Sequence, residues 1–191
     1  GTPTFLNDDE ILFLMQEIQR RFPFEADGEF SIEVDPRSCP PSKVKTLKKA
    51  GFNRMSLGVQ DFNPEVQKAV NRVQPVELTR SVLEAAREEG FHSINMDLIY
   101  GLPKQTRESF RRTIEQVIEL SPDRIALYHY AHLPNIFKPQ RMILPADLPG
   151  AGERVNIMFV AIRTLTASGY CYIGMDHFAK VDDELSIAQR N

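Results

Sequence analysis

Residues 51–62 read GFNRMSLGVQDF, and the six residues 55–60 within this stretch alternate between two kinds of side chain. The apolar members occupy every second position and are Met55, Leu57 and Val59. The positions between them carry small or polar residues, namely Ser56, Gly58 and Gln60. A period of two is typical of a β-strand with two different faces. The stretch therefore predicts a strand with one face packed under helices and a second, polar face that ends at Gln60.

Two further segments, 29–35 and 93–98, alternate in the same way, and their polar faces include Glu33 and Asp97. Helical patterns lie between the strand patterns. We expect helices to begin near residues 7, 42, 63, 77, 106 and 152, and strands at 29–35, 55–60, 94–98, 124–130 and 170–175. Such an alternation predicts the α/β class, with right-handed crossovers and parallel strands.

The polar face of these strands is unusual, because a parallel sheet covered by helices on both sides is apolar on both faces. An antiparallel sheet with one wet face is an alternative, but the intervening helices argue against hairpins between successive strands. A closed or partly closed barrel explains the pattern better, with helices outside and Glu33, Gln60 and Asp97 converging on one mouth. Arg72 could pair there with a ligand carboxylate, or be an ordinary surface arginine.

The composition indicates one domain over residues 1–191, without a strong charge. The chain has 23 Lys and Arg against 26 Asp and Glu, so we expect neither nucleic acid nor an anionic membrane as a partner. Two basic runs, 43–49 and 107–112, are interpreted as the solvated faces of helices. No stretch approaches the roughly 20 apolar residues of a membrane span.

Cysteines, histidines and common motifs give little evidence for a metal or nucleophile site. Cys39 and Cys171 lack a ligand spacing and are expected to be reduced thiols in the cytoplasm. His132 and His177 could bind a metal together with Asp176, but no ligand motif supports this, and structural or substrate-contact roles are favoured. Dinucleotide, phosphate-loop and nucleophile-elbow motifs are absent from the sequence. The proline-rich connection 134–149 is expected to be a functional loop or a mobile flap.

Several motifs together resemble one family. They are GTPT at 1–4, SIEVDP at 31–36, GFNRMSLGVQDF at 51–62, NMDLIYGLPKQT at 95–106, YAHLP at 130–134 and GMDHFA at 174–179. Over essentially the whole chain, they resemble the oxygen-independent coproporphyrinogen III oxidases, which are radical S-adenosylmethionine (SAM) enzymes. Heme chaperones of the same superfamily are the alternative, but Asp61, YAHLP and GMDHFA favour the oxidases. A third possibility is an inert structural core without activity of its own.

The resemblance implies a partial (β/α)6 TIM-like barrel, with two SAM molecules beside a [4Fe-4S] cluster. The implied reaction is hydrogen abstraction from substrate propionates by a 5'-deoxyadenosyl radical, with loss of carbon dioxide, which converts coproporphyrinogen III to protoporphyrinogen IX. We expect Gln60 and Asp97 to bind ribose hydroxyls and Arg72 a methionyl carboxylate. The full set of cofactor residues carried over by motif is Gly1, Thr2, Glu33, Gln60, Arg72, Asp97 and Ala131. We expect Glu33 to bind a methionyl ammonium group or a ribose, and the backbone of Ala131 to contact an adenine edge.

The sequence also departs from that family. The CxxxCxxC cluster motif, the first two barrel strands and the C-terminal domain of the family do not occur in it, so it is interpreted as the central and C-terminal part of the barrel core. We expect this chain alone neither to bind the cluster nor to cleave SAM, and we assign no catalytic residue or metal ligand. The complete enzyme is expected to be a monomer. The fragment could self-associate through the exposed sheet edge before the Phe30 strand.

Overall fold

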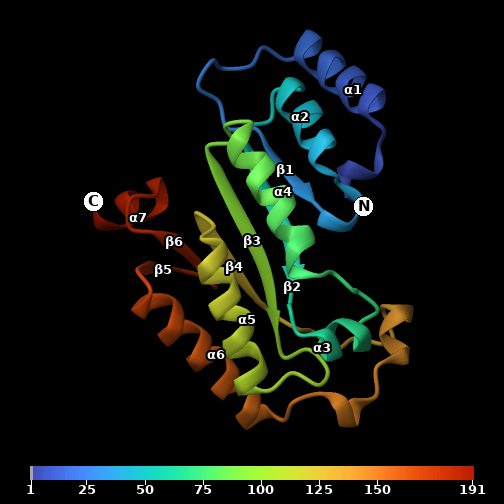
Figure 1. Cartoon of the computed structure of the whole chain (residues 1–191), viewed down its shortest axis with the longest axis vertical. Helices are drawn as coiled ribbons and strands as arrows, with labels where there is room; N and C mark the ends of the chain where they lie inside the picture. Colours follow the sequence, from blue (N-terminus) through green and yellow to red (C-terminus); the bar gives the residue numbers. More distant parts are fainter. Residues whose placement is uncertain (1) are drawn as a thin grey trace. The chain divides into compact units, whose positions relative to one another are not determined.

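The computed structural model describes residues 2–191, which form two compact units (Figure 1). Unit 1 comprises the chain up to Val59 together with Pro75–Met96. Unit 2 comprises Gln60–Gln74 and Asp97–Asn191. Strands β2 and β3 each run from the first unit into the second.

The order of elements follows the predicted alternation closely. The α-helices are α1 (Asp8–Arg21), α2 (Pro41–Lys49), α3 (Pro64–Ala69), α4 (Val76–Glu88), α5 (Arg107–Leu120), α6 (Ala151–Ala167) and α7 (Glu184–Arg190). The strands are β1 (Ser31–Val34), β2 (Arg54–Gln60), β3 (Ser93–Tyr100), β4 (Arg124–His129), β5 (Tyr170–Gly174) and β6 (His177–Lys180). Short 3-10 helices are η1 (Pro3–Phe5), η2 (Pro36–Ser38), η3 (Lys138–Met142) and η4 (Pro145–Asp147).

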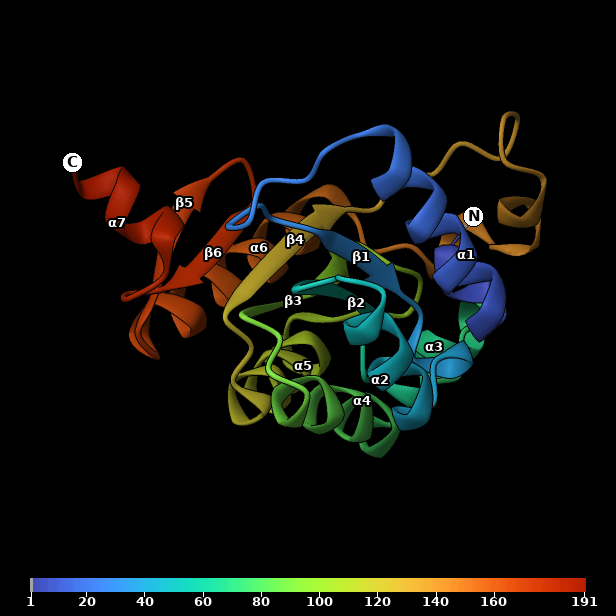
Figure 2. The same cartoon turned by 90° about the horizontal axis from the view of Figure 1, so that it is seen from above.

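The strands form one sheet in the order β1-β2-β3-β4-β6-β5. Strands β1 and β2 lie side by side and are parallel, with Glu33 opposite Ser56 in the register (Figure 2). The Asn95 amide donates a 2.8 Å hydrogen bond to Ser56 Oγ, so polar residues of neighbouring strands meet on one face. The predicted apolar face is buried, as shown by Ile32, Val34, Met55, Leu57, Val59, Ile94, Met96 and Leu98. The two-faced strand pattern is therefore confirmed.

In unit 1, local signals set the helix boundaries. Asn7 and Glu10 form a capping box at the start of α1, where a helix was expected, with reciprocal hydrogen bonds of 2.9 and 2.8 Å. Gly51 ends the α2 segment with φ of +101°, a conformation that favours glycine. Helix α1 packs beside α2, and α2 packs beside α4 (Figure 1).

One interpretation of the basic run 43–49 is wrong. Lys43 is only 9% exposed, and its ammonium group donates to the backbone carbonyls of Thr4, at 2.7 Å, and of Leu6. A buried ammonium group needs such acceptors, because it is otherwise desolvated without compensation. Lys43 therefore anchors the N-terminal loop that contains η1, instead of lying on a solvated face.

In unit 2, α5 begins at Thr106, as predicted, and a capping box with Ser109 closes its first turn. Helices α5 and α6 pack together, and α5 buries Phe110, Ile114 and Val117 completely. None of the helices in residues 2–191 is long and apolar enough to cross a membrane.

The C-terminal strands depart from the predicted parallel arrangement. Strand β6 pairs antiparallel with both β4 and β5. Only Met175 and Asp176 connect β5 to β6, and both have positive φ, +46° and +64°. A two-residue turn of this kind can join only antiparallel neighbours. The sequence analysis did not predict the four-residue strand β6, which begins at His177.

Candidate functional site

Unit 2 contains a cavity of about 430 Å³ at the carboxyl ends of several strands. Gln60 is the last residue of β2, Ile99 lies near the end of β3, and Tyr130 follows β4. The lining residues are Gln60, Ala69, Val70, Asn71, Arg72, Ile99, Leu102, Tyr130, Pro139, Gln140, Met142 and Ile143. The predicted site residues Gln60 and Arg72 are thus brought together in an otherwise largely apolar cavity. This composition is typical of small-molecule sites, which combine apolar walls with a few polar groups.

Two residues that line this cavity have a positive φ. Gln60 and Asn71 have φ of +69° and +53°, a left-handed conformation that is unfavourable for residues other than glycine. Such conformations persist where the surrounding structure enforces them, and they cluster at functional sites. Asparagine adopts this conformation more readily than most residues, so the strain at Gln60 is the observation that supports a functional role for the cavity.

The loop that carries Arg72 is fixed by the buried side chain of Gln67. The Gln67 amide nitrogen donates to the carbonyl oxygens of Asp61, at 2.9 Å, and Gln74, at 2.7 Å. Its oxygen accepts the Gln74 N–H at 2.9 Å, and the Arg72 N–H donates to the Gln67 carbonyl at 2.8 Å. Arg72 is therefore presented by a closed, internally bonded turn.

Part of the proline-rich connection forms one wall of the cavity. Helix η3 contributes Pro139, Gln140 and Met142. The Gln140 amide nitrogen donates to the Ala131 carbonyl at 3.0 Å, so Ala131 is tied to this wall through its backbone. Burial raises the pKa of the Tyr130 phenol above its usual range.

The other predicted residues are placed as follows. Asp97 is half-buried on β3 and is not among the residues that line the cavity. Thr2, at the start of η1, and Glu33, on β1, are exposed residues of unit 1. Gly1 lies outside the described residues.

Sequence reasoning missed most of the cavity wall. Tyr130 belongs to the YAHLP motif, so its position directly after a strand could have identified it. The residues of η3 gave a weaker signal, because only the prolines marked the connection as unusual. No periodicity could have shown which of its side chains turn toward Gln60.

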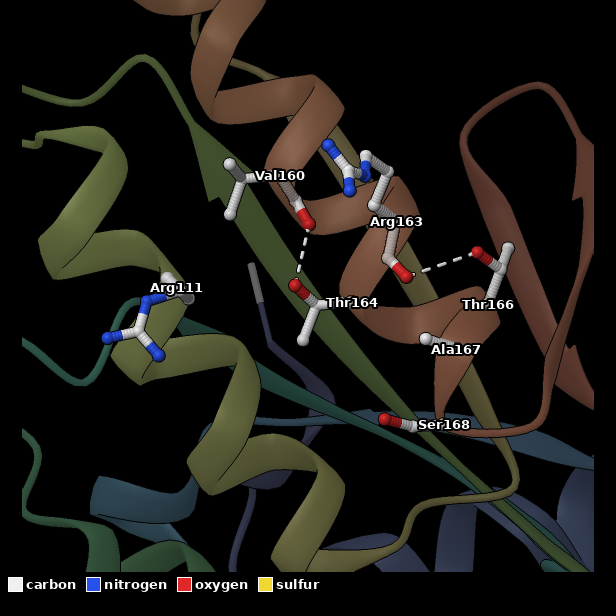
Figure 3. Close-up of a pocket in the computed structure, with 7 residues that line it drawn as sticks. All are labelled: Arg111, Val160, Arg163, Thr164, Thr166, Ala167 and Ser168. Atoms are coloured by element: carbon white, nitrogen blue, oxygen red, sulfur yellow. Dashed lines mark hydrogen bonds between the residues drawn. The ribbon is translucent and has the colours of Figure 1, made fainter.

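A second cavity, of about 710 Å³, lies in the groove between α5 and α6 (Figure 3). Its lining residues are Arg111, Val160, Arg163, Thr164, Thr166, Ala167 and Ser168. Thr164 and Thr166 donate their hydroxyl groups to backbone carbonyls of α6, and Arg111 forms an ion pair with Glu108. The two hydroxyl groups and the Arg111 guanidinium therefore already have partners within their own helices. The larger cavity is therefore an open groove between helices, and the smaller one at the strand ends is the better candidate site.

The described residues offer no group of three or more His, Cys, Asp or Glu that could hold a metal ion. His177 Nδ1 lies 2.7 Å from the Met175 carbonyl, and His132 Nδ1 lies 3.3 Å from the Tyr130 hydroxyl, so both rings have local partners. Burial raises the pKa of the Cys39 thiol to about 11. The raised pKa disfavours the thiolate form of Cys39, which is the form that binds iron.

Comparison with known proteins identifies the family. The model of the radical SAM superfamily matches residues 1–117, more than half of the chain. The chain belongs to the radical SAM superfamily. A solved structure of the radical SAM enzyme coproporphyrinogen III oxidase (HemN) from Escherichia coli superposes on this chain with a TM-score of 0.97 and 55% sequence identity. The match includes 100% of this chain and 44% of the HemN chain. This confirms the predicted fold class, an α/β partial TIM-like barrel with a mostly parallel sheet.

Curated relatives carry the same name along the whole chain. The oxygen-independent coproporphyrinogen III oxidase of Escherichia coli (strain K12) is 55% identical over 190 residues, which are 100% of this chain and 42% of the relative. The oxidase of Pseudomonas aeruginosa is 51% identical over 193 residues, again 100% of this chain and 42% of the relative. This radical SAM chain thus spans less than half the length of these relatives.

The superfamily implies SAM and a [4Fe-4S] cluster, and the described residues fit only the first. SAM carries a carboxylate, ribose hydroxyls and an apolar adenine face. The cavity offers Arg72, the Gln60 amide and apolar walls, and its volume is within the usual range for small ligands. Gln60 is also held in a strained conformation there. The cluster has no such site among residues 2–191, and no step of the reaction is derived through it.

Proposed function

We propose that this chain is the SAM-binding part of an oxygen-independent coproporphyrinogen III oxidase. The observation that carries the proposal is the match of the entire chain to that enzyme at 55% identity, with Gln60 and Arg72 at one cavity. The substrate would be coproporphyrinogen III, and the product protoporphyrinogen IX. A single domain over residues 1–191 and a cytoplasmic location stay predictions.

The proposed residue roles follow from side-chain chemistry. Arg72 can hold a carboxylate through paired N–H groups, and the Gln60 amide can donate to and accept from ribose hydroxyls. Asp97 is proposed to accept from ribose hydroxyls, and the Ala131 backbone to contact adenine. Thr2 and Glu33 are proposed to complete the cofactor contacts, together with Gly1. The sequence motifs of the family support these assignments, and they also support the binding of two SAM molecules.

The chain's own contribution would be to bind and orient. In the complete enzyme, bound SAM supplies the hydrogen-atom abstraction. Each of two propionate side chains of the substrate would then lose one hydrogen atom, one electron and carbon dioxide, and a vinyl group would remain in its place. The cavity with its fixed backbone at Gln60 suits this role, because a fixed geometry lowers the barrier of a reaction between two bound groups.

Binding of the cofactor is tested with S-adenosylhomocysteine, which lacks the reactive sulfonium. Isothermal titration would compare the wild-type chain with Arg72→Ala and with Arg163→Ala, which changes the groove between α5 and α6. We expect Arg72→Ala to weaken binding at least tenfold, since hydrogen bonds to a charged group contribute about 1.5–3 kcal/mol. Arg163→Ala should bind like the wild type. Equal affinities for all three proteins would contradict the proposed site.

The oxidase activity is tested in a chimera. This chain would replace the matching 190 residues of the Escherichia coli oxidase, which supplies the remainder of the enzyme. We expect anaerobic conversion of coproporphyrinogen III to protoporphyrinogen IX, and loss of product when the chimera carries Arg72→Ala. A chimera with cluster absorbance and SAM binding but without product would refute the oxidase. Retention of heme by that inactive chimera would favour the chaperone alternative.

A further inference from the structure

A buried carboxylate lies directly behind the cavity, at Asp61. The residue is 1% exposed and follows Gln60 in the sequence. Its Oδ1 accepts from the Thr113 hydroxyl at 2.6 Å and from the Asn63 N–H at 2.7 Å. Its Oδ2 accepts from the Gln105 amide at 2.6 Å. These three partners are all neutral groups, and their hydrogen bonds offset part of the cost of burying the carboxylate.

The partners of Asp61 continue the network to the cavity wall. Gln105 Nε2 also donates to the Ile99 carbonyl at 3.0 Å, and Gln105 Oε1 accepts the Gly101 N–H at 2.6 Å. Ile99 and Leu102 both line the cavity. The carboxylate thus joins the end of β2, the segment after β3 and helix α5, which are separated in the sequence by 44 and 52 residues.

We infer that Asp61 is a positioning residue, which holds Gln60 and the 99–105 segment in the geometry of the cavity. Asp61 touches no ligand in this scheme and acts through its neighbours. The bond to Asn63 N–H fixes the turn that follows the strained Gln60, and the bond to Gln105 fixes the opposite wall. The inference deepens the proposed function, and the role as cofactor site rests on that proposal.

The substitution Asp61→Asn probes this network with little change in volume. The new amide must direct its NH2 group at one of the former donors. If the new NH2 group faces Gln105, two donors oppose each other. The Gln105 amide cannot rotate to relieve this without losing its hydrogen bonds to the Ile99 carbonyl and the Gly101 N–H. If the NH2 group faces Thr113 and Asn63, it opposes the Asn63 N–H. Either arrangement breaks the connection between the two walls.

A matched control is Asp183→Asn, which also alters a well-buried carboxylate of unit 2. Asp183 pairs with Arg124 at 2.9 Å and caps α7 through the Leu185 N–H at 2.8 Å. Neither Asp183 nor these partners line the cavity. The control therefore measures what the loss of a buried carboxylate does to the unit without touching the cavity walls.

The experiment is hydrogen–deuterium exchange of the whole chain, read segment by segment. We expect Asp61→Asn to accelerate exchange on the order of tenfold or more in 60–67 and 99–105, with strands β5 and β6 unchanged. Asp183→Asn should act only around β6 and α7. Unchanged exchange of 60–67 and 99–105 in Asp61→Asn, or equal acceleration there by the control, would overturn the inference.

Two additions keep the test decisive. If Asp61→Asn does not fold, Thr113→Val removes one donor with little change of shape, and the same segments should respond more weakly; an unchanged pattern would overturn the inference. S-adenosylhomocysteine affinity should fall at least tenfold in Asp61→Asn and stay unchanged in Asp183→Asn; equal affinities would refute positioning of the ligand site. If the wild type does not bind this probe, the proposed function fails, while the exchange pattern still decides the role of Asp61.

Discussion

The strained backbone of Gln60 predicts that glycine is more stable than alanine at this position, the reverse of the usual order. Gln60 ends β2 with φ of +69°, a conformation that glycine adopts without penalty. We therefore expect Gln60→Gly to be more stable than Gln60→Ala, although glycine normally destabilises regular structure. Both variants lack the amide, so the comparison isolates the backbone.

The magnitude follows from two opposing effects. A left-handed conformation costs alanine roughly 1–2 kcal/mol, which glycine avoids. Glycine has greater freedom in the unfolded chain, which offsets about 0.4–1 kcal/mol of that gain. With the middle of both ranges, the net advantage of Gln60→Gly is about 0.8 kcal/mol. With a urea m-value of about 2 kcal/mol/M, the unfolding midpoint should lie about 0.3–0.5 M above that of Gln60→Ala.

The assay is urea unfolding followed by circular dichroism, with midpoint and slope fitted separately. The control is Asn156, an exposed residue in the interior of α6. There, Asn156→Gly should be about 1 kcal/mol less stable than Asn156→Ala, since glycine is a poor helix former. The reasoning is refuted if glycine is no better than alanine at position 60 while the control behaves as expected.

Three further variants test other parts of the structure. Lys43→Met leaves the carbonyls of Thr4 and Leu6 without their buried donor, and should lower the free energy of unfolding in urea by about 1–3 kcal/mol; a change below about 0.5 kcal/mol would contradict the anchoring role. Gly101→Ala should cost about 1–2 kcal/mol in the same assay, because φ is +85° and the added Cβ would lie 3.4 Å from Arg154 Cδ; wild-type stability would exclude strain there. Cys39→Ala tests the raised thiol pKa: between pH 9 and 11 the unfolded thiol ionises while the folded one stays protonated, so wild-type stability falls with rising pH, by at most about 1.4 kcal/mol per pH unit, and the variant should lack this component. Equal pH slopes for the wild type and Cys39→Ala would contradict the shift.

Local patterns were sufficient to predict most elements of the fold. The capping residues Asn7, Asn63 and Thr106 each begin a helix at the expected place, because a cap depends on neighbours within one turn. The alternation at 55–60 predicted a two-faced strand, because side chains of a strand point to opposite faces in turn. Gln60 was predicted from the strand pattern and Arg72 through the family resemblance; both line the cavity, and their role in binding stays a prediction.

The features that were missed depend on partners distant in the sequence. Lys43 looked like one member of a basic run, and only the fold brings it to the carbonyls of Thr4 and Leu6, more than 35 residues away. The antiparallel β6 is four residues long and carries too little periodicity to be distinguished from a loop. The wall formed by η3 depends on Gln140 reaching back to Ala131, which no local pattern encodes.

The two unfavourable features of the site are neighbours in the sequence, and the structure indicates why. A strained residue returns to a relaxed conformation unless its surroundings fix it more strongly than the strain opposes them. Strand β2 ends at Gln60, so the hydrogen bonds of the strand cannot fix the backbone that follows this residue. Asp61 supplies it instead, through bonds to Asn63, Gln105 and Thr113. Each of those bonds alone is worth about as much as the left-handed penalty, and together they exceed it. The Asp61 carboxylate and the strained backbone of Gln60 therefore act together. We expect the free energy of unfolding lost on removing the Asp61 carboxylate to be smaller in Gln60→Gly, where the strain is relaxed, than in the wild type.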